Sequence, residues 1–407
     1  MRPRVLSGAN LVLPGRVLAP GTIVIEGDRI VEVASGARPV SDGVEHVDLR
    51  DQHVVPGFVD VHVHGIDGHD VMDGGDGLVS VATMLPRYGV TAFCPTSVAC
   101  APRDLRALLA DVRRLRTHPP PSAARILPAH LESNFIAPQY AGAQPIACLR
   151  RPPAADPARP ESSRAESPDS FTGVEVLDEI SRARTEVAIV TLAPELPGGL
   201  DLVRALTAQG HRVSVGHSAA DFEEGLAAVS AGACHATHLF NRMPPLAHRA
   251  PGLVGAVLQS ESMVAEVVCD GFHVHPALVR LTVACKQPAG TMAITDGTAA
   301  SGLAPGSRTR LGGRPIVARE MAAYLDDGTL AGSVCTMDRA FRTLVVRVGL
   351  SWVDAVTLCA TTPAVALGLD GYGAIRVGAV ADLTVLDPHL TVVRTYVGGA
   401  LAYSRTE

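Results

Sequence analysis

Short apolar runs alternate with longer amphipathic segments along most of the chain. The longer segments have the spacing of helices, at residues 102–116, 199–210, 219–233 and 275–286. Strands that alternate with helices predict a parallel sheet covered by helices, here a (β/α)8 barrel, with a doubly wound open sheet as the alternative. Eight apolar runs predict the strands, at residues 54–64, 91–97, 125–132, 187–195, 212–218, 234–240, 263–271 and 291–297.

The two ends of the chain have a different pattern. The segment "GTIVIEGDRIVEVAS", residues 21–35, predicts a β-hairpin with its turn at "EGDR". Residues 373–399 again contain short strand patterns separated by turn residues. Residues 150–170 are rich in Pro, Ser, Ala and Arg and have no periodicity, so they predict an exposed loop outside the compact barrel.

Composition narrows the class of protein. The chain has 407 residues, 47% hydrophobic and 19% charged, which is typical of globular proteins. A net charge of −6 without basic blocks argues against nucleic acid as a partner. The N-terminus has no signal-peptide core, and no apolar run reaches membrane-spanning length. The eight scattered cysteines are typical of a reducing compartment, so we expect a cytoplasmic protein.

The first predicted barrel strand carries an unusual polar face. In "PGFVDVHVHG", residues 56–65, valines occupy one face, and Asp60, His62 and His64 occupy the other. Burying an imidazole without a partner is costly. The two histidines are therefore either hydrogen-bonded core residues or metal ligands.

Polar residues close several other predicted strands as well. The C-terminal ends of barrel strands meet at one rim, where active sites of such enzymes lie. Imidazole and carboxylate groups together are ligands for zinc or another divalent transition metal. The sequence therefore predicts a metal site built from the residues that close the first, third, fifth, sixth and eighth strands: His62 and His64, Glu132, His217, His238 and Asp296.

Each of these residues also has a structural interpretation. His217 alone is compatible with an ordinary core or surface histidine, and Asp296 with the cap of a following helix. His235 falls on the strand face opposite His238, so at most one of them is a ligand and we interpret His235 as structural. His130 shares a face with Glu132 and is a candidate supporting partner.

A second His-x-His lies in "CDGFHVHP". By spacing alone, His273 and His275 are an alternative metal pair. They follow Asp-Gly and precede Pro276 at the predicted start of a helix, a position that favours a substrate contact.

Motifs along almost the whole chain resemble the N-acetylglucosamine-6-phosphate deacetylases, a family of the metal-dependent amidohydrolase superfamily. The motifs are "PGFVDVHVHG", "HLE", "VTLAPELPG", "GHS", "HATHLFNRMPPLAHRAPGLVGA", "DGFHVHP", "ITDG", "DGTLAGSVCTMDRA", "TTPAVALGL" and "GAIRVGAVADLTVLD". The resemblance implies a (β/α)8 barrel at residues 55–349, a small β-sandwich domain formed by residues 1–54 and 350–407, and a homodimer. It also implies a hydrolase that uses a divalent metal, one or two per subunit, to cleave the amide of an N-acetyl amino sugar phosphate. Zinc is the expected ion, and iron, cobalt or manganese are alternatives.

The resemblance also assigns roles to individual residues. It implies that Glu132, His217 and His238 bind the first metal, that His62 and His64 support a second, and that Asp296 is the catalytic acid and base. It implies that Arg249 and His273 contact the substrate phosphate, with His273 reaching across the dimer. The remaining implied substrate contacts are Ala143, Gln144, Asn241, Arg242, Leu330, Ala331 and Gly332.

The departures from the family pattern lie in the segments expected beside the amide and the sugar. Ser133 and Asn134 replace the usual Gly-Pro, Gln144 replaces a His, and Arg242 replaces an Ala. We therefore expect a deacetylase of N-acetylglucosamine 6-phosphate or of a close analogue, with a shift in specificity as one hypothesis and neutral drift as the other. The alternatives are a relative that hydrolyses a different N-acyl compound and an inactive protein that binds a sugar phosphate.

Overall fold

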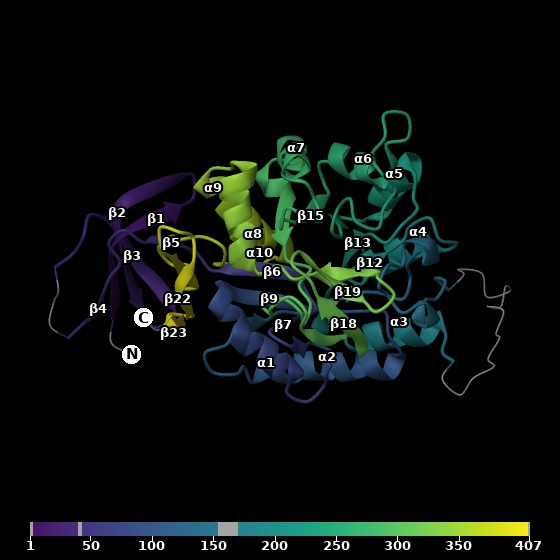
Figure 1. Cartoon of the computed structure of the whole chain (residues 1–407), viewed down its shortest axis with the longest axis horizontal. Coiled ribbons are helices and arrows are strands. Elements are labelled where there is room, and N and C mark those ends of the chain that lie inside the picture. Colours follow the sequence, from purple (N-terminus) through teal and green to yellow (C-terminus); the bar gives the residue numbers. More distant parts are fainter. Residues whose placement is uncertain (1–2, 40–42, 154–169, 406–407) are drawn as a thin grey trace.

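The structure, a computed structural model, describes residues 3–39, 43–153 and 170–405. Figure 1 shows a strand-rich part, which holds both chain ends, beside a larger part in which strands are surrounded by helices. Residues 154–169, most of the predicted Pro-rich and Ser-rich loop, lie outside the described residues.

Eight parallel strands form the barrel. The prediction of a (β/α)8 barrel is confirmed, and the doubly wound alternative is wrong. The barrel closes where the first and last strands meet: Val63 forms a β-bridge with Gly297, and the Asp296 amide donates to the His62 carbonyl oxygen at 3.1 Å. The strands pair in the order β6 (Phe58–Val63), β9 (Val90–Ser97), β11 (Ala129–Glu132), β12 (Val187–Leu192), β13 (Arg212–Val215), β14 (His235–Ala236), β15 (Val264–Val268) and β16 (Thr291–Ile294), and β10 (Arg125–Ile126) also pairs with β9.

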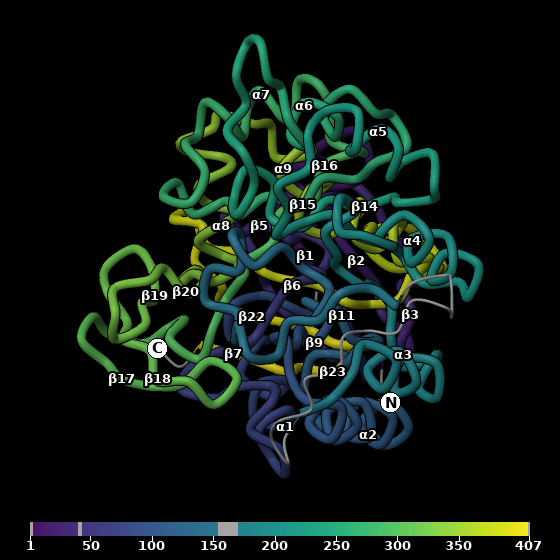
Figure 2. The backbone as a smooth tube through the Cα atoms, turned by 90° about the vertical axis from the view of Figure 1, so that its right-hand side faces the viewer, coloured from purple at the N-terminus to yellow at the C-terminus, as the bar shows by residue number. Residues whose placement is uncertain are grey.

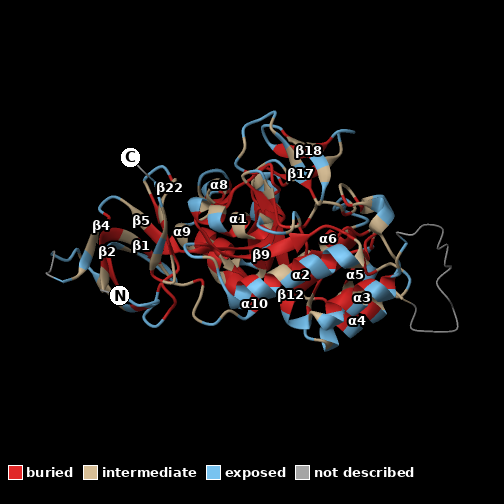
Figure 3. Ribbon diagram, turned by 90° about the horizontal axis from the view of Figure 1, so that it is seen from below, coloured by how far each residue is buried: buried red, intermediate tan, exposed pale blue. Residues whose placement is uncertain are grey.

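Helices form the outer layer of the barrel. In α2, buried leucines and valines recur every three or four residues, from Leu105 to Leu115, and form the inner face. Pro102 begins this helix, where its missing amide hydrogen costs nothing. Figure 3 shows the buried strands and the exposed outer faces of the helices. The helices are α1 (Gly77–Met84), α2 (Pro102–Thr117), α3 (Gly173–Arg182), α4 (Gly199–Ala208), α5 (Phe222–Ala231), α6 (Gly252–Gln259), α7 (Pro276–Lys286), α8 (Met337–Thr343), α9 (Trp352–Val356) and α10 (Thr362–Leu367).

The two chain ends form one eight-stranded sheet. The predicted hairpin is present, with Glu26 opposite Arg29 at its turn. Strand β1 pairs with β4 through its first half and with β5 further along, and the inward side chains, including Leu6, Ile23 and Tyr396, form a separate apolar core. The strands are β1 (Arg4–Leu13), β2 (Arg16–Glu26), β3 (Arg29–Ser35), β4 (Glu45–Asp48), β5 (His53–Pro56), β21 (Leu383–Leu386), β22 (Val392–Val397) and β23 (Ala400–Ser404).

The segment between the chain-end strands and the barrel is helical. A π-helical turn at Thr357–Thr361 joins α9 to α10, and Leu367 packs in one cluster with Val59 and Ile294 of the barrel strands. After the barrel, the chain therefore re-enters the eight-stranded sheet at β21. No helix within residues 3–39, 43–153 and 170–405 is long and apolar enough to cross a membrane.

A second antiparallel sheet, which the sequence pattern did not predict, lies beside the barrel. Ser333 of its last strand forms a β-bridge with Gly297, and the Ser333 amide donates to the Asp296 carbonyl oxygen at 2.9 Å. Figure 2 shows the four strands as a separate lobe next to the end of the barrel. They are β17 (Arg308–Leu311), β18 (Arg314–Ala318), β19 (Ala322–Leu325) and β20 (Leu330–Ser333); a further pair of short strands, β7 (Gly65–Ile66) and β8 (His69–Asp70), follows β6.

Candidate active site

Six polar side chains meet at the C-terminal ends of the barrel strands, the rim where the sequence predicts a site. Three of them, His217, His238 and Asp296, have left-handed backbone φ angles of 48°, 31° and 48°. Such angles are strained for residues other than glycine and gather at functional sites. The six residues, which we call the strand wall, are His62, His64, Glu132, His217, His238 and Asp296.

Glu132 is the centre of the strand wall. Its Oε1 lies 2.9 Å from His217 Nε2 and 3.0 Å from His238 Nε2. The same oxygen lies 3.6 Å from His62 Nε2, and Oε2 lies 3.4 Å from His64 Nε2. The carboxylate is therefore shared by two groups of donor atoms.

The hydrogen bonds of the opposite ring nitrogens show what the strand wall can hold. The Nδ1 atoms of His64 and His217 lie 3.0 and 2.8 Å from backbone carbonyl oxygens. A carbonyl only accepts, so each Nδ1 carries a hydrogen, and Nε2 is the ring nitrogen left to face Glu132 and to bind a cation. His62 Nδ1 is held in the same way by Glu266, at 3.1 Å. The Nε2 atoms of His62 and His64 lie 3.3 Å apart, close enough to bind one cation together.

The electrostatics of the strand wall also favour positive charge. Burial raises the pKa of Glu132, but the charges and hydrogen bonds of His217, His238 and His64 outweigh burial and hold that pKa well below its usual value. Burial lowers the pKa of His64, but hydrogen bonds with Asp296 and Glu132 outweigh it and raise the pKa to about 10. These residues fit a divalent cation in two groups, one of Glu132, His217 and His238 and one of Glu132, His62 and His64.

Asp296 lies beside the second group. Its Oδ1 is 3.4 Å from Nε2 of both His62 and His64, and its side chain is 13% exposed. It is the one member of the strand wall whose burial is only intermediate. Burial raises its pKa, but the hydrogen bond from His64 and the charges of His62 and His238 outweigh burial and lower it. An ionised carboxylate at this position is suited to accept a proton in the cavity.

A supporting layer lies beneath the strand wall inside the barrel. The sequence predicts His130 as a partner of Glu132, but His130 bonds instead to the Val61 carbonyl oxygen at 3.0 Å and to Thr191 Oγ1 at 2.7 Å. Glu266 of β15, which sequence reasoning missed, is the residue that holds His62. The sequence did contain a signal, because a glutamate inside the apolar run "MVAEVV" is unusual for a strand that is expected to be buried. Burial raises the pKa of Glu266 to about 7.

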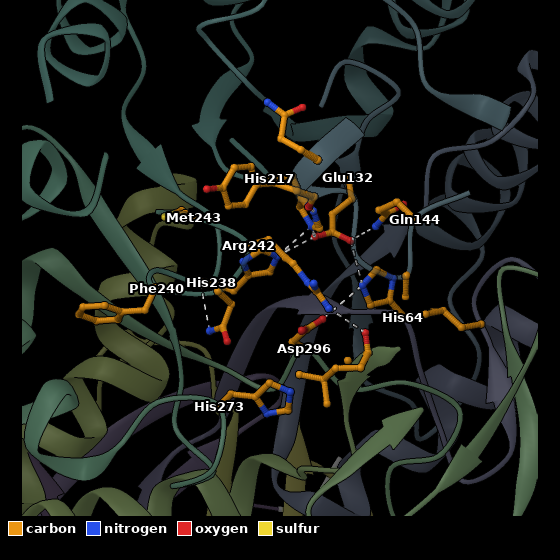
Figure 4. Close-up of a pocket in the computed structure, with 17 residues that line it drawn as sticks. His64, Glu132, Gln144, His217, His238, Phe240, Arg242, Met243, His273 and Asp296 are labelled. Carbon is orange, nitrogen blue, oxygen red and sulfur yellow. Dashed lines mark hydrogen bonds and ion pairs between the residues drawn. The ribbon is translucent and has the colours of Figure 1, made fainter. Parts of the chain in front are cut away.

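Five members of the strand wall, all except the fully buried His62, line the bottom of a cavity of about 440 Å³. This volume lies within the range of roughly 300–1,000 Å³ that is typical of small-molecule sites. Figure 4 shows His64, Glu132, His217, His238 and Asp296 directed toward the same space. Other lining residues that sequence reasoning missed are Gln139, Tyr140, Phe240, Met243 and Leu311.

The opposite side of the cavity is formed mainly by loops and by β20. We call it the loop wall, and its members are only partly buried. The Asn241 amide nitrogen donates to the His238 carbonyl oxygen at 3.2 Å, and Arg242 Nη2 donates to the Leu330 carbonyl oxygen at 3.3 Å. The loop wall consists of Ala143, Asn241, Arg242, His273, Leu330 and Gly332, all of them predicted substrate contacts.

Gln144 connects the two walls. Its Oε1 accepts from the Ala99 amide at 2.7 Å, and its Nε2 donates to Glu132 Oε2. The amide therefore orients the shared carboxylate from the cavity side. Ser133 and Asn134, expected beside the substrate, are buried: Ser133 donates to the Thr191 carbonyl oxygen at 2.5 Å, and Asn134 donates to two backbone carbonyl oxygens. Neither is among the described residues that line the cavity, so their substitution supports the loop rather than the site.

Other predicted residues lie elsewhere. Arg249 is exposed and Ala331 is buried in the core of the β17–β20 sheet, and within the described chain neither lines the cavity. His273 lines the cavity of its own chain, where Asp270 Oδ2 holds its Nδ1 at 2.6 Å. His275 caps α7 by accepting from the Ala277 amide at 3.2 Å. The alternative metal pair is therefore wrong, since neither His273 nor His275 belongs to a ligand group among the described residues.

Comparisons with known proteins agree with the barrel and its rim. Residues 53–402 match the sequence profile described as the amidohydrolase family. The class is thus that of the amidohydrolases, barrel enzymes in which a metal at this rim assists hydrolysis.

More similar proteins narrow the class. An N-acetylglucosamine-6-phosphate deacetylase from Mus musculus is 34% identical over 99% of this chain and 95% of its own. One from Bacillus subtilis (strain 168) is 31% identical over 98% and 96%. The structure of a mutant N-acetyl-D-glucosamine-6-phosphate deacetylase from Mycobacterium smegmatis, in complex with N-acetyl-D-glucosamine-6-phosphate, superimposes with a TM-score of 0.86 at 30% identity over 99% of this chain and 100% of its own. The chain therefore belongs to the N-acetylglucosamine-6-phosphate deacetylase family of amidohydrolases.

Proposed function

We propose that this chain hydrolyses the amide of an N-acetyl amino sugar phosphate, N-acetylglucosamine 6-phosphate or a close analogue, to the amino sugar phosphate and acetate. The observation that carries the proposal is the meeting of two ligand groups and Asp296, all of whose members except His62 line one cavity. Nearly full-length similarity to deacetylases supports the choice of reaction.

Glu132, His217 and His238 would hold one divalent cation, and Glu132 with His62 and His64 a second. Imidazole and carboxylate ligands favour zinc, with iron, cobalt and manganese as alternatives. Such an ion, when bound, lowers the pKa of water and polarises a carbonyl group. The carbonyl oxygens and Glu266 behind the rings of His64, His217 and His62 hold each Nδ1, so that Nε2 is the nitrogen that would bind the ion.

Asp296 would move the protons of the reaction. In this role its carboxylate accepts a proton from the attacking water and donates it to the amide nitrogen as the C–N bond breaks. An amine leaves poorly unless it is protonated, so the second transfer matters as much as the first. The partial exposure of Asp296 toward the cavity supports this assignment.

The loop wall would bind the amino sugar phosphate. Asn241, Ala143, Leu330 and Gly332 supply polar and small groups beside the ring. His273, which lines the cavity, would contact the phosphate. Arg249 is exposed and lies outside the cavity of the described chain, so it would contact a phosphate only from outside this cavity. Family resemblance supports a homodimer, which the mass of the protein in solution can test. It also supports a cytoplasmic location.

The test of the proposed function is acetate release from N-acetylglucosamine 6-phosphate by protein loaded with zinc, iron, cobalt or manganese in turn. The D296N variant is the matched control, because it removes the proton acceptor and keeps the ligands. Acetate release by the wild type alone supports the proposal. Equal release by wild type and variant, or no release from any N-acetyl amino sugar phosphate, contradicts it.

A further inference from the structure

The side chain of Arg242 lies inside the catalytic cavity and is held there from two sides. Its Nη2 donates to the Leu330 carbonyl oxygen at 3.3 Å. Its stem lies against Gly142, where the Cβ atom of any larger residue would be only 2.5 Å from Arg242 Nε. Gly142 has a φ of 61°, which disfavours a larger residue there and leaves this surface free for the Arg242 side chain. Figure 4 shows the side chain extending into the cavity.

The surface beneath Arg242 is itself anchored. Arg314 Nη1 donates to the Ala143 carbonyl oxygen at 2.7 Å, and the Ala99 amide donates to Gln144 Oε1 at 2.7 Å. Arg242 has a left-handed φ of 53°, within the turn that also carries His238. Strain of this kind persists where the surroundings hold a residue in place. The guanidinium group is thus positioned before any ligand arrives.

The charge of Arg242 is not neutralised by the protein. Among residues 3–39, 43–153 and 170–405, no carboxylate oxygen lies within 4.0 Å of the guanidinium, and the hydrogen bond to Leu330 is the one that its side chain makes. A guanidinium group has five N–H donors. Most of them are therefore available to a ligand in the cavity.

His273 adds a second polar group to the same cavity. Its side chain is 3% exposed, and its Nε2 is buried without a hydrogen-bond partner among the described residues. Asp270 accepts from Nδ1, so the opposite nitrogen is free for a ligand. Arg249 is exposed and does not line the cavity of the described chain, which leaves Arg242 as the arginine of this wall.

We infer that Arg242, which stands where the family pattern has an alanine, is a specificity-determining residue whose side chain binds an oxyanion of the substrate. The inference rests on the proposed function. Two sources of the oxyanion share this chemistry: the phosphate of the sugar and a carboxylate on the acyl group. Both match the planar, forked donors of arginine.

The test compares three amides in wild type, R242Q and R242K. N-acetylglucosamine 6-phosphate carries the phosphate, N-succinylglucosamine carries a carboxylate on the acyl group, and N-acetylglucosamine carries neither. Gln and Lys, like Arg, have an unbranched Cβ atom, so the strain of the left-handed backbone at residue 242 is the same in all three proteins. We expect R242Q to raise KM for at least one anionic amide roughly 10-fold to 100-fold, as for one charge-assisted contact, and to change N-acetylglucosamine less than about 2-fold. R242K should recover part of the loss.

The pattern of loss identifies the source of the oxyanion. Loss confined to the phosphorylated amide assigns the phosphate, and loss confined to the succinyl amide assigns the acyl carboxylate; either supports the inference. An equal rise in KM for all three amides overturns the inference. It is also overturned if R242Q has the wild-type KM for all three amides and only R249A loses the preference for the phosphorylated amide. R204A, an exposed arginine on α4, controls for net charge.

Calorimetry separates this inference from the proposed function. Glucosamine 6-phosphate and glucosamine are titrated into wild type and R242Q, a measurement that needs no turnover. If wild type hydrolyses none of the three amides, the proposed function fails, and Arg242-dependent binding of the phosphorylated amine still supports the inference. If R242Q hydrolyses the amides as the wild type does and binds both amines with unchanged affinity, the inference on Arg242 is overturned and the proposed function stands.

Discussion

The two walls of the cavity are built on different principles. In the strand wall, the His residues and Glu132 are at most 4% exposed, and almost every ring nitrogen has a backbone or carboxylate partner. In the loop wall, the residues are half-buried and two of them, Arg242 and His273, present side-chain nitrogens that the described protein does not use.

This difference separates chemistry from selection. Groups that hold a cation must be rigid, because ligand distances tolerate little variation. Barrel strands provide that rigidity through their shared hydrogen bonds. Groups that select a substrate lie on loops, which change without disturbing the barrel. We therefore expect substitutions in the strand wall to affect every substrate, and those in the loop wall to affect substrates selectively.

The largest effect is expected for H217A or H238A. Either change leaves Glu132 with one imidazole in the first ligand group, so bound metal and turnover should both be lost on all substrates. Metal content per chain, measured by mass spectrometry, checks this outcome. The control is H118A, an exposed histidine at the end of α2. Full turnover by metal-free H217A would rule out the metal site.

A smaller but still general effect is expected for D296N. This change keeps the shape of the side chain and removes the proton acceptor, so turnover should fall roughly 10²–10⁴-fold. Metal content should stay near that of the wild type, since the two ligand groups do not include Asp296. Retention of more than about a tenth of the activity would mean that Asp296 is structural, because general catalysis is worth more than that.

An intermediate effect is expected for E266Q, which tests the support of the strand wall. The carboxylate that holds His62 Nδ1 becomes an amide that can turn either way. Affinity for the second metal should fall about 10-fold to 100-fold, while the first site is unchanged. Metal titration followed by calorimetry distinguishes the two sites. E179Q is the control, a buried glutamate paired with Arg106 on α2, far from the cavity. Two equally weakened sites would contradict the role assigned to Glu266.

The smallest and most selective effect is expected for R249A. If this exposed arginine reaches a phosphate, KM should rise for the phosphorylated amide and stay constant for N-acetylglucosamine. The change should be less than about 10-fold, because an exposed charge is screened by solvent. Equal KM changes for both amides would show that Arg249 does not contact the phosphate. Arg249 would then have no part in the selection of substrates by the loop wall.

Much of the fold was predictable because its signals are local. Strand alternation in residues 56–65 and the helical spacing in residues 102–116 are properties of single segments. Both are present as β6 and α2. The β17–β20 sheet was missed, because its strands are short and each pairs with a neighbour only after the turns have formed.

The strand wall was predictable for a related reason. A polar residue at the end of a barrel strand must lie at the rim whatever the rest of the chain does. Six such residues could therefore be grouped before any distance was known, although their roles as ligands stay predictions. The support of the wall was not predictable in the same way. Glu266 and His62 lie 204 residues apart and meet only because the barrel closes.

The sequence by itself determined the order of strands and helices, the family, and the set of polar groups at the rim, because these follow from periodicity and from position along a strand. The tertiary structure alone decided which of those groups share a partner. It placed Ser133 and Asn134 behind the loop, left Arg249 outside the cavity and brought Arg242 across to Leu330. The physical reason is that a side chain's direction depends on contacts between segments distant in sequence, which no local pattern records.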